Sequence, residues 1–457
     1  MKKLMRIKPL LFKFLSPERI FILGFMGVIL CGTFLLWSPF STAKGRLTFV
    51  DALFTSTSAV CVTGLASIDI GKDLSFAGQM ITIFLFQVGG LGIITFSTVF
   101  FVLMGRGISF RGRDIVQSTF LHTPRLDFMV ILKSVLWFTL FFESLGILFL
   151  WIRFTQDFSF GHAFYQAVYH AISAFNNCGY SLFSDNLVRY QGDWIVNLTV
   201  MSLIVIGGIG FIVQYEVFAK WRGKQKRLSV HTRIVLIVTG ILIMGGALSI
   251  YFLEKEHILR GLPLKNQILA SFFQSIVPRT AGFNTVDIGL LVNETILLMI
   301  VLMFIGASPG STGGGVKTTS TALLFLLLWS RMRGQEEVNI FKRTIPKELI
   351  SRALAIIFAS AFCIAVITSI LLLTPSVELP PSETRHLFVE YLFETVSAFG
   401  TVGLSMNLTP KLNDIQKLAI ILMMFAGRVG PLTLAFSLSL TASRKTLTYA
   451  EEGVMVG

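Results

Sequence analysis

Four short polar segments interrupt an otherwise apolar sequence, and each of them ends on a glycine. In every copy an aromatic residue stands ten positions before that glycine, and successive glycines are about one hundred residues apart. Self-similarity at such a spacing is the sequence signature of a fold built from repeated units. The sequence therefore predicts four related units in one chain, centred on 54–64, 169–179, 272–282 and 393–403.

Composition places these units in a lipid bilayer. Hydrophobic residues make up 53% of the 457 residues and charged residues only 14%, which is too apolar for a water-soluble globular protein. A helix needs roughly 20 apolar residues to cross a bilayer, and eight runs are near or above that length. We expect an all-α polytopic membrane protein whose first helix is retained, with spans at 20–37, 78–104, 128–151, 194–218, 234–253, 296–329, 350–373 and 415–440.

The formal net charge of +14 is explained by membrane topology, without a nucleic-acid partner. The lysines and arginines lie in short loops beside apolar runs and not on an amphipathic or soluble domain. They gather before the first run and after the second, fourth, sixth and eighth runs, whereas the alternate loops carry fewer. By the positive-inside rule we expect a multi-pass protein of the cell membrane with both termini in the cytoplasm.

Each unit reads as a helix, a short re-entrant pore segment and a second helix, because the polar segments are too short to cross the bilayer. Non-helical backbone at membrane depth needs protein or a water-filled cavity around it. We therefore expect the four segments to converge with pseudo-fourfold symmetry on one ion pore. The predicted units are 1–120, 121–228, 229–345 with an intramembrane loop at 306–315, and 346–457 with a cytoplasmic C-terminal tail.

The end of each polar segment is suited to a filter for monovalent cations. A half-helix that ends inside the membrane points the negative end of its dipole at the centre, which favours a cation there. The glycine can adopt a positive φ angle and expose backbone carbonyls that replace the water shell of an ion. A glycine cap would explain any one copy, but not four. The predicted filter residues are Val62, Thr63, Gly64, Asn177, Cys178, Gly179, Thr280, Ala281, Gly282, Thr401, Val402 and Gly403.

The second helix of each unit carries a cluster of small residues at a matching depth, in 89–92, 207–210, 306–309 and 427–430. Small residues let helices approach closely. This packing role is favoured over pore lining for Gly89, Gly90, Gly207 and Gly208.

The third cluster continues into a glycine-rich stretch that cannot remain helical, because Pro309 and several hydroxyl residues join the glycines there. A loop at membrane depth beneath the filter would be a deformable plug in the ion path, and we interpret it as a gate. The alternatives are a plain hinge and a Walker nucleotide loop, but Val316 breaks the Walker spacing and the flanks are apolar. The predicted gate residues are Gly306, Ala307, Ser308, Pro309, Gly310, Ser311, Thr312, Gly313, Gly314, Gly315, Lys317 and Arg428.

Arg428 introduces a positive charge where the other second helices have Gly90, Gly208 and Ala307. An arginine inside a membrane costs about 2.5–3.5 kcal/mol on insertion scales, so it usually has a function or a close partner. Near the pore axis it would repel cations and hydrogen-bond loop carbonyls. The alternative is a structural anchor to carbonyls away from the pore.

These features together resemble the Trk/Ktr/HKT superfamily of potassium transporters, most closely its bacterial KtrB-type membrane subunits. The resemblance rests on the four filter glycines, on GASPGSTGGGVKTT at 306–319 and on MFAGRVGPLT at 424–433. It implies a potassium filter, potassium uptake stimulated by sodium ion as an activator, a homodimer, and regulation by a KtrA-like cytoplasmic nucleotide-binding ring. No dinucleotide-binding motif is present in this sequence, so such a regulator would be a separate chain.

Two other functional classes compete with a gated potassium pore. An alternating-access secondary cation symporter would also use a broken helix near the membrane midplane, but inverted twofold repeats would be expected instead of four pore repeats. A membrane enzyme is disfavoured because the sequence lacks HExxH, GxSxG and any clustered set of carboxylates and histidines.

Overall fold

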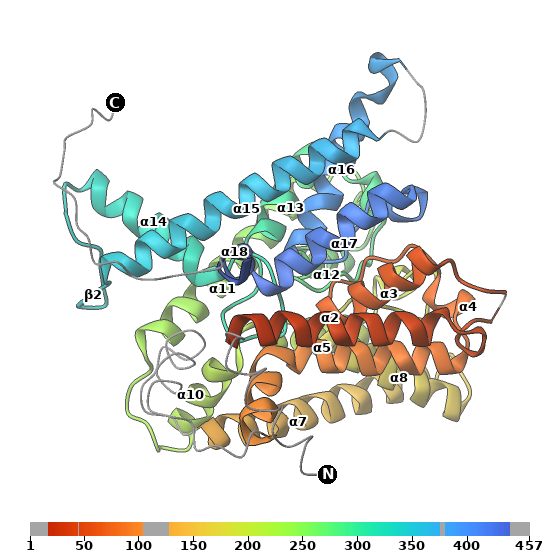
Figure 1. Ribbon diagram of the computed structural model, residues 1–457, viewed down its shortest axis with the longest axis horizontal. Helices are drawn as coiled ribbons and strands as arrows, with labels where there is room; N and C mark the ends of the chain where they lie inside the picture. The colour runs from red at the N-terminus through yellow and green to blue at the C-terminus, as the bar shows by residue number, and fades with distance from the viewer. Residues whose placement is uncertain (1–16, 44, 104–127, 375–379, 439–457) are drawn as a thin grey trace, which may run out of the picture.

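The computed structural model describes residues 17–43, 45–103, 128–374 and 380–438. Helices make up nearly all of the regular structure of these residues, as Figure 1 shows. Besides helices, the regular structure of these residues includes one two-stranded antiparallel ribbon, formed by β1 (Asn339–Ile340) and β2 (Arg343–Thr344). The predicted all-α fold is confirmed.

Each predicted unit contains a first helix, a shorter pore helix and a second helix. In unit 1 these are α2 (Pro17–Trp37), α3 (Phe49–Cys61) and α5 (Phe76–Leu103), with the short α4 (Ile70–Asp73) between the last two. In unit 2 they are α7 (Phe128–Phe154), α8 (Phe160–Phe175), α9 (Trp194–Gly208) and α10 (Phe211–Trp221). In unit 3 they are α11 (Val230–Glu254), α12 (Leu264–Ile276), α13 (Asn293–Phe304) and α14 (Thr318–Met332), and in unit 4 α15 (Lys347–Leu373), α16 (Pro381–Gly400), α17 (Asp414–Val429) and α18 (Pro431–Leu438). Short 3-10 turns at Pro39–Ser41, Val188–Tyr190, Ile288–Leu290 and Thr409–Lys411 lie in the connections.

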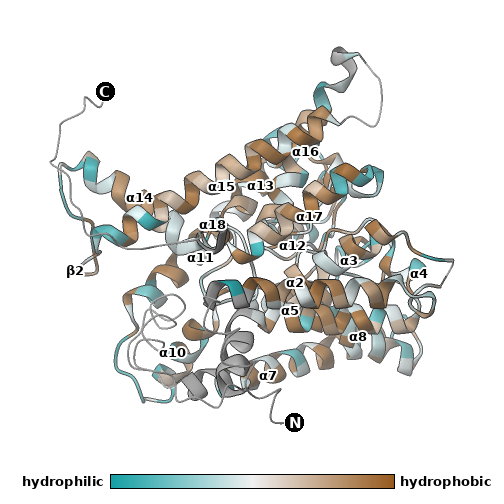
Figure 2. Cartoon of the chain, viewed as in Figure 1, coloured by the Kyte–Doolittle hydropathy of each residue, from teal (hydrophilic) through white to brown (hydrophobic). Residues whose placement is uncertain are grey.

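Apolar side chains dominate the long helices, and hydrophilic residues gather at the turns around α4 and β2 (Figure 2). Three described helices are each long and apolar enough to cross a bilayer, namely Lys133–Phe154, Val230–Glu254 and Lys347–Leu373. The pair α9 and α10 adds a fourth if it is taken as one bent span. The described parts of α2, α5 and α13 are apolar but shorter, at Ile22–Trp37, Phe76–Gly92 and Asn293–Phe304.

Three of the eight expected spans are not continuous helices. The interruption of 296–329 is the one that the sequence predicts, whereas 194–218 and 415–440 are expected to be continuous, so these two predictions are wrong in detail. The span 194–218 breaks after Gly208, and its halves meet at 100°. The span 415–440 breaks at Gly430, and its last two residues lie outside the described part of the chain. Both breaks fall on glycines with φ near +90°, Gly210 at +95° and Gly430 at +92°, a conformation that residues with a side chain rarely adopt. Sequence hydropathy does not register such a break because the residues on both sides are apolar.

Helix contacts link the four units in a closed order. The first helix of each unit packs on its own pore helix, as in α2 with α3 and α7 with α8. The second helix of each unit also contacts the pore helix of the next unit: α5 contacts α8, α9 contacts α12, α13 contacts α16, and α17 contacts α3. The fourth unit (blue) therefore lies beside the first (red and orange) in Figure 1. The ends of the four pore helices are brought toward one another by this order.

Candidate ion filter and gating loop

The four pore helices end in similar backbone turns. The residue two positions before each filter glycine has a positive φ angle: +57° at Val62, +60° at Asn177, +77° at Thr280 and +49° at Thr401. The glycines follow with φ angles of +90°, +82°, +66° and +91° at Gly64, Gly179, Gly282 and Gly403. Positive φ is unusual for a β-branched residue such as Val62 or Thr401, which indicates a backbone held by its surroundings.

Hydrogen bonds explain how three of these turns are held. In unit 1 the backbone N–H of Thr63 donates to the Ser58 carbonyl at 2.8 Å and that of Val62 to the Ala59 carbonyl at 3.0 Å. This pair is the Schellman arrangement that ends many helices in a left-handed residue. Units 2 and 4 repeat it, with Cys178 donating to Ser173 and Val402 to Ser397, both at 2.8 Å. Unit 3 differs, because Ala281 donates to Val277 four residues back, at 3.0 Å.

The filter glycines contact one another in a ring. A methyl group built on Gly64 would lie 2.0 Å from the carbonyl oxygen of Cys178, which precedes the next filter glycine. A methyl group built in the same way on the other three glycines would also lie close to a carbonyl oxygen. The distances are 2.5 Å from Gly179 to Ala281, 2.6 Å from Gly282 to Val402 and 2.1 Å from Gly403 to Thr63. Each glycine thus faces the carbonyl that precedes the glycine of the following unit. No side chain fits at any of these positions unless the backbone moves.

Small residues on three second helices are packing positions, as the sequence predicts for those of units 1 and 2 but not for Gly427 of unit 4. Gly89, Gly207 and Gly427 each lie against the carbonyl oxygen of a residue four positions before a filter glycine. A methyl group on them would lie 2.0 Å from the Val60 oxygen, 2.0 Å from the Phe175 oxygen and 1.9 Å from the Phe399 oxygen, respectively. Gly90 packs in turn on the Asn176 side chain, at 2.1 Å by the same construction.

The third unit has a loop in place of this contact. Residues 305–317 leave the helical conformation between α13 and α14, and Ile305 pairs with Val316 in an isolated parallel bridge. The Ser308 and Thr318 hydroxyls lie 3.0 Å apart, and the Lys317 ammonium donates to the Gly313 carbonyl at 2.8 Å. The two ends of the loop are therefore joined, and its tip lies among the other units.

The tip of the loop lies beside the inner ends of the pore turns. The Gly314 N–H donates to the Thr401 hydroxyl at 2.9 Å, and the Thr312 hydroxyl donates to the Phe175 carbonyl at 3.4 Å. A methyl group on Gly313 would lie 2.1 Å from the Thr280 hydroxyl oxygen. The loop thus contacts pore-turn residues of units 2, 3 and 4.

The break between α9 and α10 is occupied by the same loop. A helix leaves its last carbonyls without intrahelical partners, and here the loop supplies donors: Ser308 N–H to Gly208 at 3.0 Å and Thr312 N–H to Gly207 at 3.3 Å. The Phe211 N–H, at the start of α10, donates back to the Gly310 carbonyl at 2.9 Å. These bonds give the physical reason for the kink that hydropathy missed.

Arg428 bridges the loop and the first unit. Its guanidinium donates to the Thr312 carbonyl of the loop and to the Gly89 carbonyl of α5, with a longer contact of 3.5 Å to the Gly90 carbonyl. The side chain is buried, with 4% of its surface exposed. Among the ion pairs of the described residues none involves Arg428, so its partners there are carbonyl dipoles. The expected bond between Arg428 and a loop carbonyl is present.

The structure brings together all twelve predicted filter residues and the whole of the predicted gate, since the loop and Arg428 lie against the pore turns. Sequence reasoning missed three contributors. It did not find the kink at Gly210, the carbonyl partners of Gly89, Gly207 and Gly427, or the role of Thr280 and Thr401 as side-chain contacts of the loop. The glycine of the kink was visible in the sequence, but its conformation is set by a loop about one hundred residues away.

A family profile described as TrkH, a cation transport protein, matches residues 21–446. The chain belongs to this family. It is 37% identical to the "Ktr system potassium uptake protein B" of Vibrio alginolyticus, across 97% of this chain and 95% of that protein. It is 38% identical to the protein of the same name from Bacillus subtilis, across 97% of both chains.

A third relative and a solved structure extend the similarity. The chain is 34% identical to the "Potassium/sodium uptake protein NtpJ" of Enterococcus hirae, across 97% of this chain and 98% of that one. The crystal structure of the potassium transporter TrkH from Vibrio parahaemolyticus matches with a TM-score of 0.72 at 21% identity, covering 93% of this chain and 86% of that one. At this identity the structural match shows the fold, an all-α polytopic membrane architecture.

Proposed function

We propose that this chain is the ion-translocating subunit of a Ktr-type system and takes up potassium through a channel-like pore. The observation that carries the proposal is the ring of four pore turns, in which each filter glycine faces the carbonyl before the next one. Consecutive carbonyls from four turns can replace the water shell of a monovalent cation. The relatives are named as potassium or potassium/sodium uptake proteins, which supports potassium as the cargo.

The pore helices supply the electrostatic part of the proposal. Each ends at the filter, so the partial negative charges of four helix C-termini face the same region. The segments converge from four units linked in a closed order, which supports pseudo-fourfold symmetry around one pore for units 1–120, 121–228, 229–345 and 346–457. The buried residues of the pore turns carry no carboxylate, so selection would rest on backbone geometry and the size of the site.

The loop at 306–315 is the proposed gate. It lies against the pore turns of three units and is held by hydrogen bonds of 2.9–3.4 Å to Phe175, Thr401, Gly207 and Gly208, which thermal motion or a partner can exchange. Arg428 holds the loop to α5 through the Thr312 carbonyl. We propose the first of the two alternatives that the sequence leaves open, in which Arg428 hydrogen-bonds a loop carbonyl and its positive charge repels cations near the ion path.

Several further features are proposed from family membership. We propose a homodimer in the cell membrane, stimulation by sodium ion, and control by a cytoplasmic nucleotide-binding ring carried by a separate chain. The basic loops at 106–125, 220–233 and 331–347 and the tail 442–457 would be docking surfaces for that ring. Of these, 106–125 and the tail lie outside the described residues. The cytoplasmic placement of the termini stays a prediction for the same reason.

Rubidium flux into liposomes that contain the purified chain tests the proposal. We expect uptake that potassium inhibits more strongly than sodium does. Gly282→Ser should abolish this discrimination, because φ is +66° there and a Cβ would lie 2.6 Å from the Val402 oxygen. Gly240→Ser is the matched control, since nothing lies within 4 Å of a Cβ at that helical position.

Deletion of 306–315 separates the gated pore from its rival. A pore gated by the loop should conduct faster without it, with potassium still preferred. Flux that needs a stoichiometric coupling ion, saturates and disappears with the loop would instead identify an alternating-access secondary symporter.

A further inference from the structure

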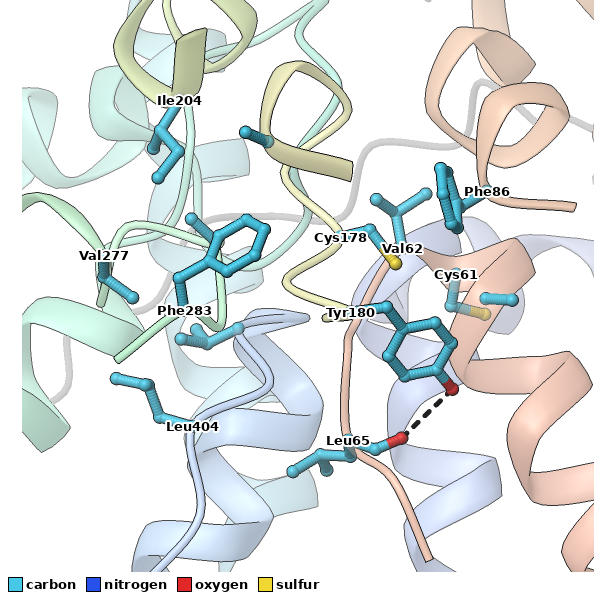
Figure 3. Close-up of a cluster of buried hydrophobic side chains, with 14 of the residues drawn as sticks. Cys61, Val62, Leu65, Phe86, Cys178, Tyr180, Ile204, Val277, Phe283 and Leu404 are labelled. Carbon is cyan, nitrogen blue, oxygen red and sulfur yellow. Dashed lines mark hydrogen bonds between the residues drawn. The ribbon is translucent and has the colours of Figure 1, made fainter. Parts of the chain in front are cut away.

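The residue after each filter glycine is buried and apolar in character, and one of the four has a hydroxyl. These residues are Leu65, Tyr180, Phe283 and Leu404, with 1%, 1%, 0% and 2% of their surfaces exposed. Figure 3 shows them around the pore turns, with a dashed line from the Tyr180 hydroxyl to the Leu65 backbone. Tyr180 alone among the four can therefore bond across the boundary between two units through its side chain.

The Tyr180 hydroxyl joins unit 2 to two parts of unit 1. Its proton is shared between the carbonyl oxygens of Leu65 and Thr55, both at 3.2 Å. Leu65 follows the filter glycine of unit 1, and Thr55 lies in the pore helix α3 that supports that turn. Within the described residues, no other hydrogen bond to the Leu65 carbonyl is found. The tyrosine thus connects one filter turn to both the turn and the helix of its neighbour.

The other end of Tyr180 is also fixed. The Ser173 hydroxyl donates to the Tyr180 carbonyl at 2.8 Å. The serines at the equivalent position in units 1 and 4 act differently, because Ser58 and Ser397 accept from the N–H of their own filter glycines at 3.0 and 3.1 Å. In unit 2 this serine holds the tyrosine backbone instead. Tyr180 is therefore held by its own pore helix at the main chain and by unit 1 at the ring.

We propose that the Tyr180 hydroxyl is a strut that sets the spacing of the first and second filter turns and so determines how well the filter separates potassium from sodium. A filter of backbone carbonyls discriminates by the size and field strength of its site, and it loses discrimination when its walls move freely. This inference rests on the proposed potassium pore. It assigns a positioning role, because the hydroxyl bonds to backbone carbonyls of unit 1 and would act on the ion through them.

Substitution Tyr180→Phe tests the strut, because it keeps the ring and removes both cross-unit hydrogen bonds. We expect the ratio of potassium to sodium in competition for rubidium uptake to fall about tenfold, a change that corresponds to about 1.4 kcal/mol. The purified variant should remain monodisperse. Tyr391→Phe is the matched control: Tyr391 is also buried, and its hydroxyl accepts from Gln416 on α17 at 3.1 Å, away from the filter turns. Its ratio should stay that of the unsubstituted chain.

Each result of this experiment either supports or overturns the strut. An unchanged ratio in Tyr180→Phe, or an equal fall in both variants, overturns the strut. If Tyr180→Phe cannot be purified, Ser173→Ala decides in its place: a lowered ratio supports the strut, and an unchanged ratio overturns it. The potassium preference of the unsubstituted chain is measured first. Its absence would contradict the proposed function itself.

Discussion

The second helices of units 1, 2 and 4 and that of unit 3 use the same small-residue position in different ways. In the first three, a glycine seats the helix directly on a carbonyl near the end of its own pore helix. In unit 3 the corresponding Gly306 lies instead against the loop that follows it, and a methyl group there would lie 2.3 Å from the Gly314 oxygen. Units 1, 2 and 4 therefore have a backbone contact between two helices at this depth, whereas unit 3 has a contact within its own loop.

This difference bears on the proposed gate, because it singles out one of the four repeated units. A helix held against a pore helix at backbone distance cannot move without moving the filter. In unit 3 the chain lacks that contact over 305–317, and the loop instead makes hydrogen bonds of 2.9–3.4 Å to the other units. If the loop is the proposed gate, the backbone contacts of units 1, 2 and 4 would keep the filter in place while the loop of unit 3 rearranged.

The largest effect is expected from filling a rigid contact. Gly207→Val would place a branched side chain on the Phe175 carbonyl oxygen, and the backbones of Gly207 and Phe175 belong to the packed helices α9 and α8. We expect a loss of folding stability beyond the about 1–3 kcal/mol of ordinary overpacking, seen as failure to recover monodisperse protein and a lowered Tm. Gly240→Val is the same substitution at a helical glycine with no atom within 4 Å of a Cβ, so this variant should behave as the unsubstituted chain.

Gly306→Val sharpens the same comparison. Because its neighbour is the proposed gating loop and not a pore helix, we expect folded protein with altered rubidium flux. If Gly306→Val and Gly207→Val lower the Tm equally, the distinction between rigid and loop contacts is wrong.

An intermediate effect is expected at the arginine that joins the two kinds of region. Arg428→Ala removes the bonds to the Thr312 and Gly89 carbonyls, and hydrogen bonds to a charged group contribute about 1.5–3 kcal/mol each. We expect rubidium flux to rise about tenfold as the loop is released. Arg428→Lys keeps the charge but lacks the planar fork that reaches both carbonyls. Low flux in Arg428→Lys would assign the effect to charge alone, and unchanged flux in Arg428→Ala would remove the gating role.

The sequence contained enough to predict the fold class, the four pore segments and the loop, because each has a local signature. Apolar runs of spanning length predict helices, and repeated glycines at equal spacing from an aromatic residue predict equivalent turns. The seating of Gly89 and Gly207 was also predictable, since small residues at matching depth favour close helix packing.

What the sequence could not predict depends on contacts between distant residues. The bend at Gly210 exists because the loop donates to the end of α9, and no local pattern near residue 210 indicates that partner. Positive φ at Val62 and Thr401 runs against the preference of β-branched residues, so propensity alone argues against the observed turn. Such positions are determined by the closed arrangement of units, which only the three-dimensional structure supplies.

The smallest effect in this series is expected from two glycines that share one conformation and differ in one contact. Gly210 has φ +95° and ψ 139°, and Gly430 has φ +92° and ψ 133°. Alanine at either position should cost on the order of 1–3 kcal/mol of stability, because this region of φ and ψ is nearly exclusive to glycine. A methyl group on Gly210 would also lie 2.6 Å from the Pro309 carbonyl of the loop, whereas the nearest atom at Gly430 is the Thr433 hydroxyl at 3.7 Å.

The free-energy cost of the backbone conformation is therefore the same in Gly210→Ala and Gly430→Ala. Any difference between the two variants reports on the contact of residue 210 with the loop. We expect similar losses in Tm for the two variants, and a rise of rubidium flux of roughly severalfold in Gly210→Ala only, from displacement of a contact of moderate strength. Equal flux in both would mean that the kink of α9 and α10 is a structural bend without influence on the loop. A flux change confined to Gly210→Ala would make the second unit, with its filter turn and its broken helix, part of the gate.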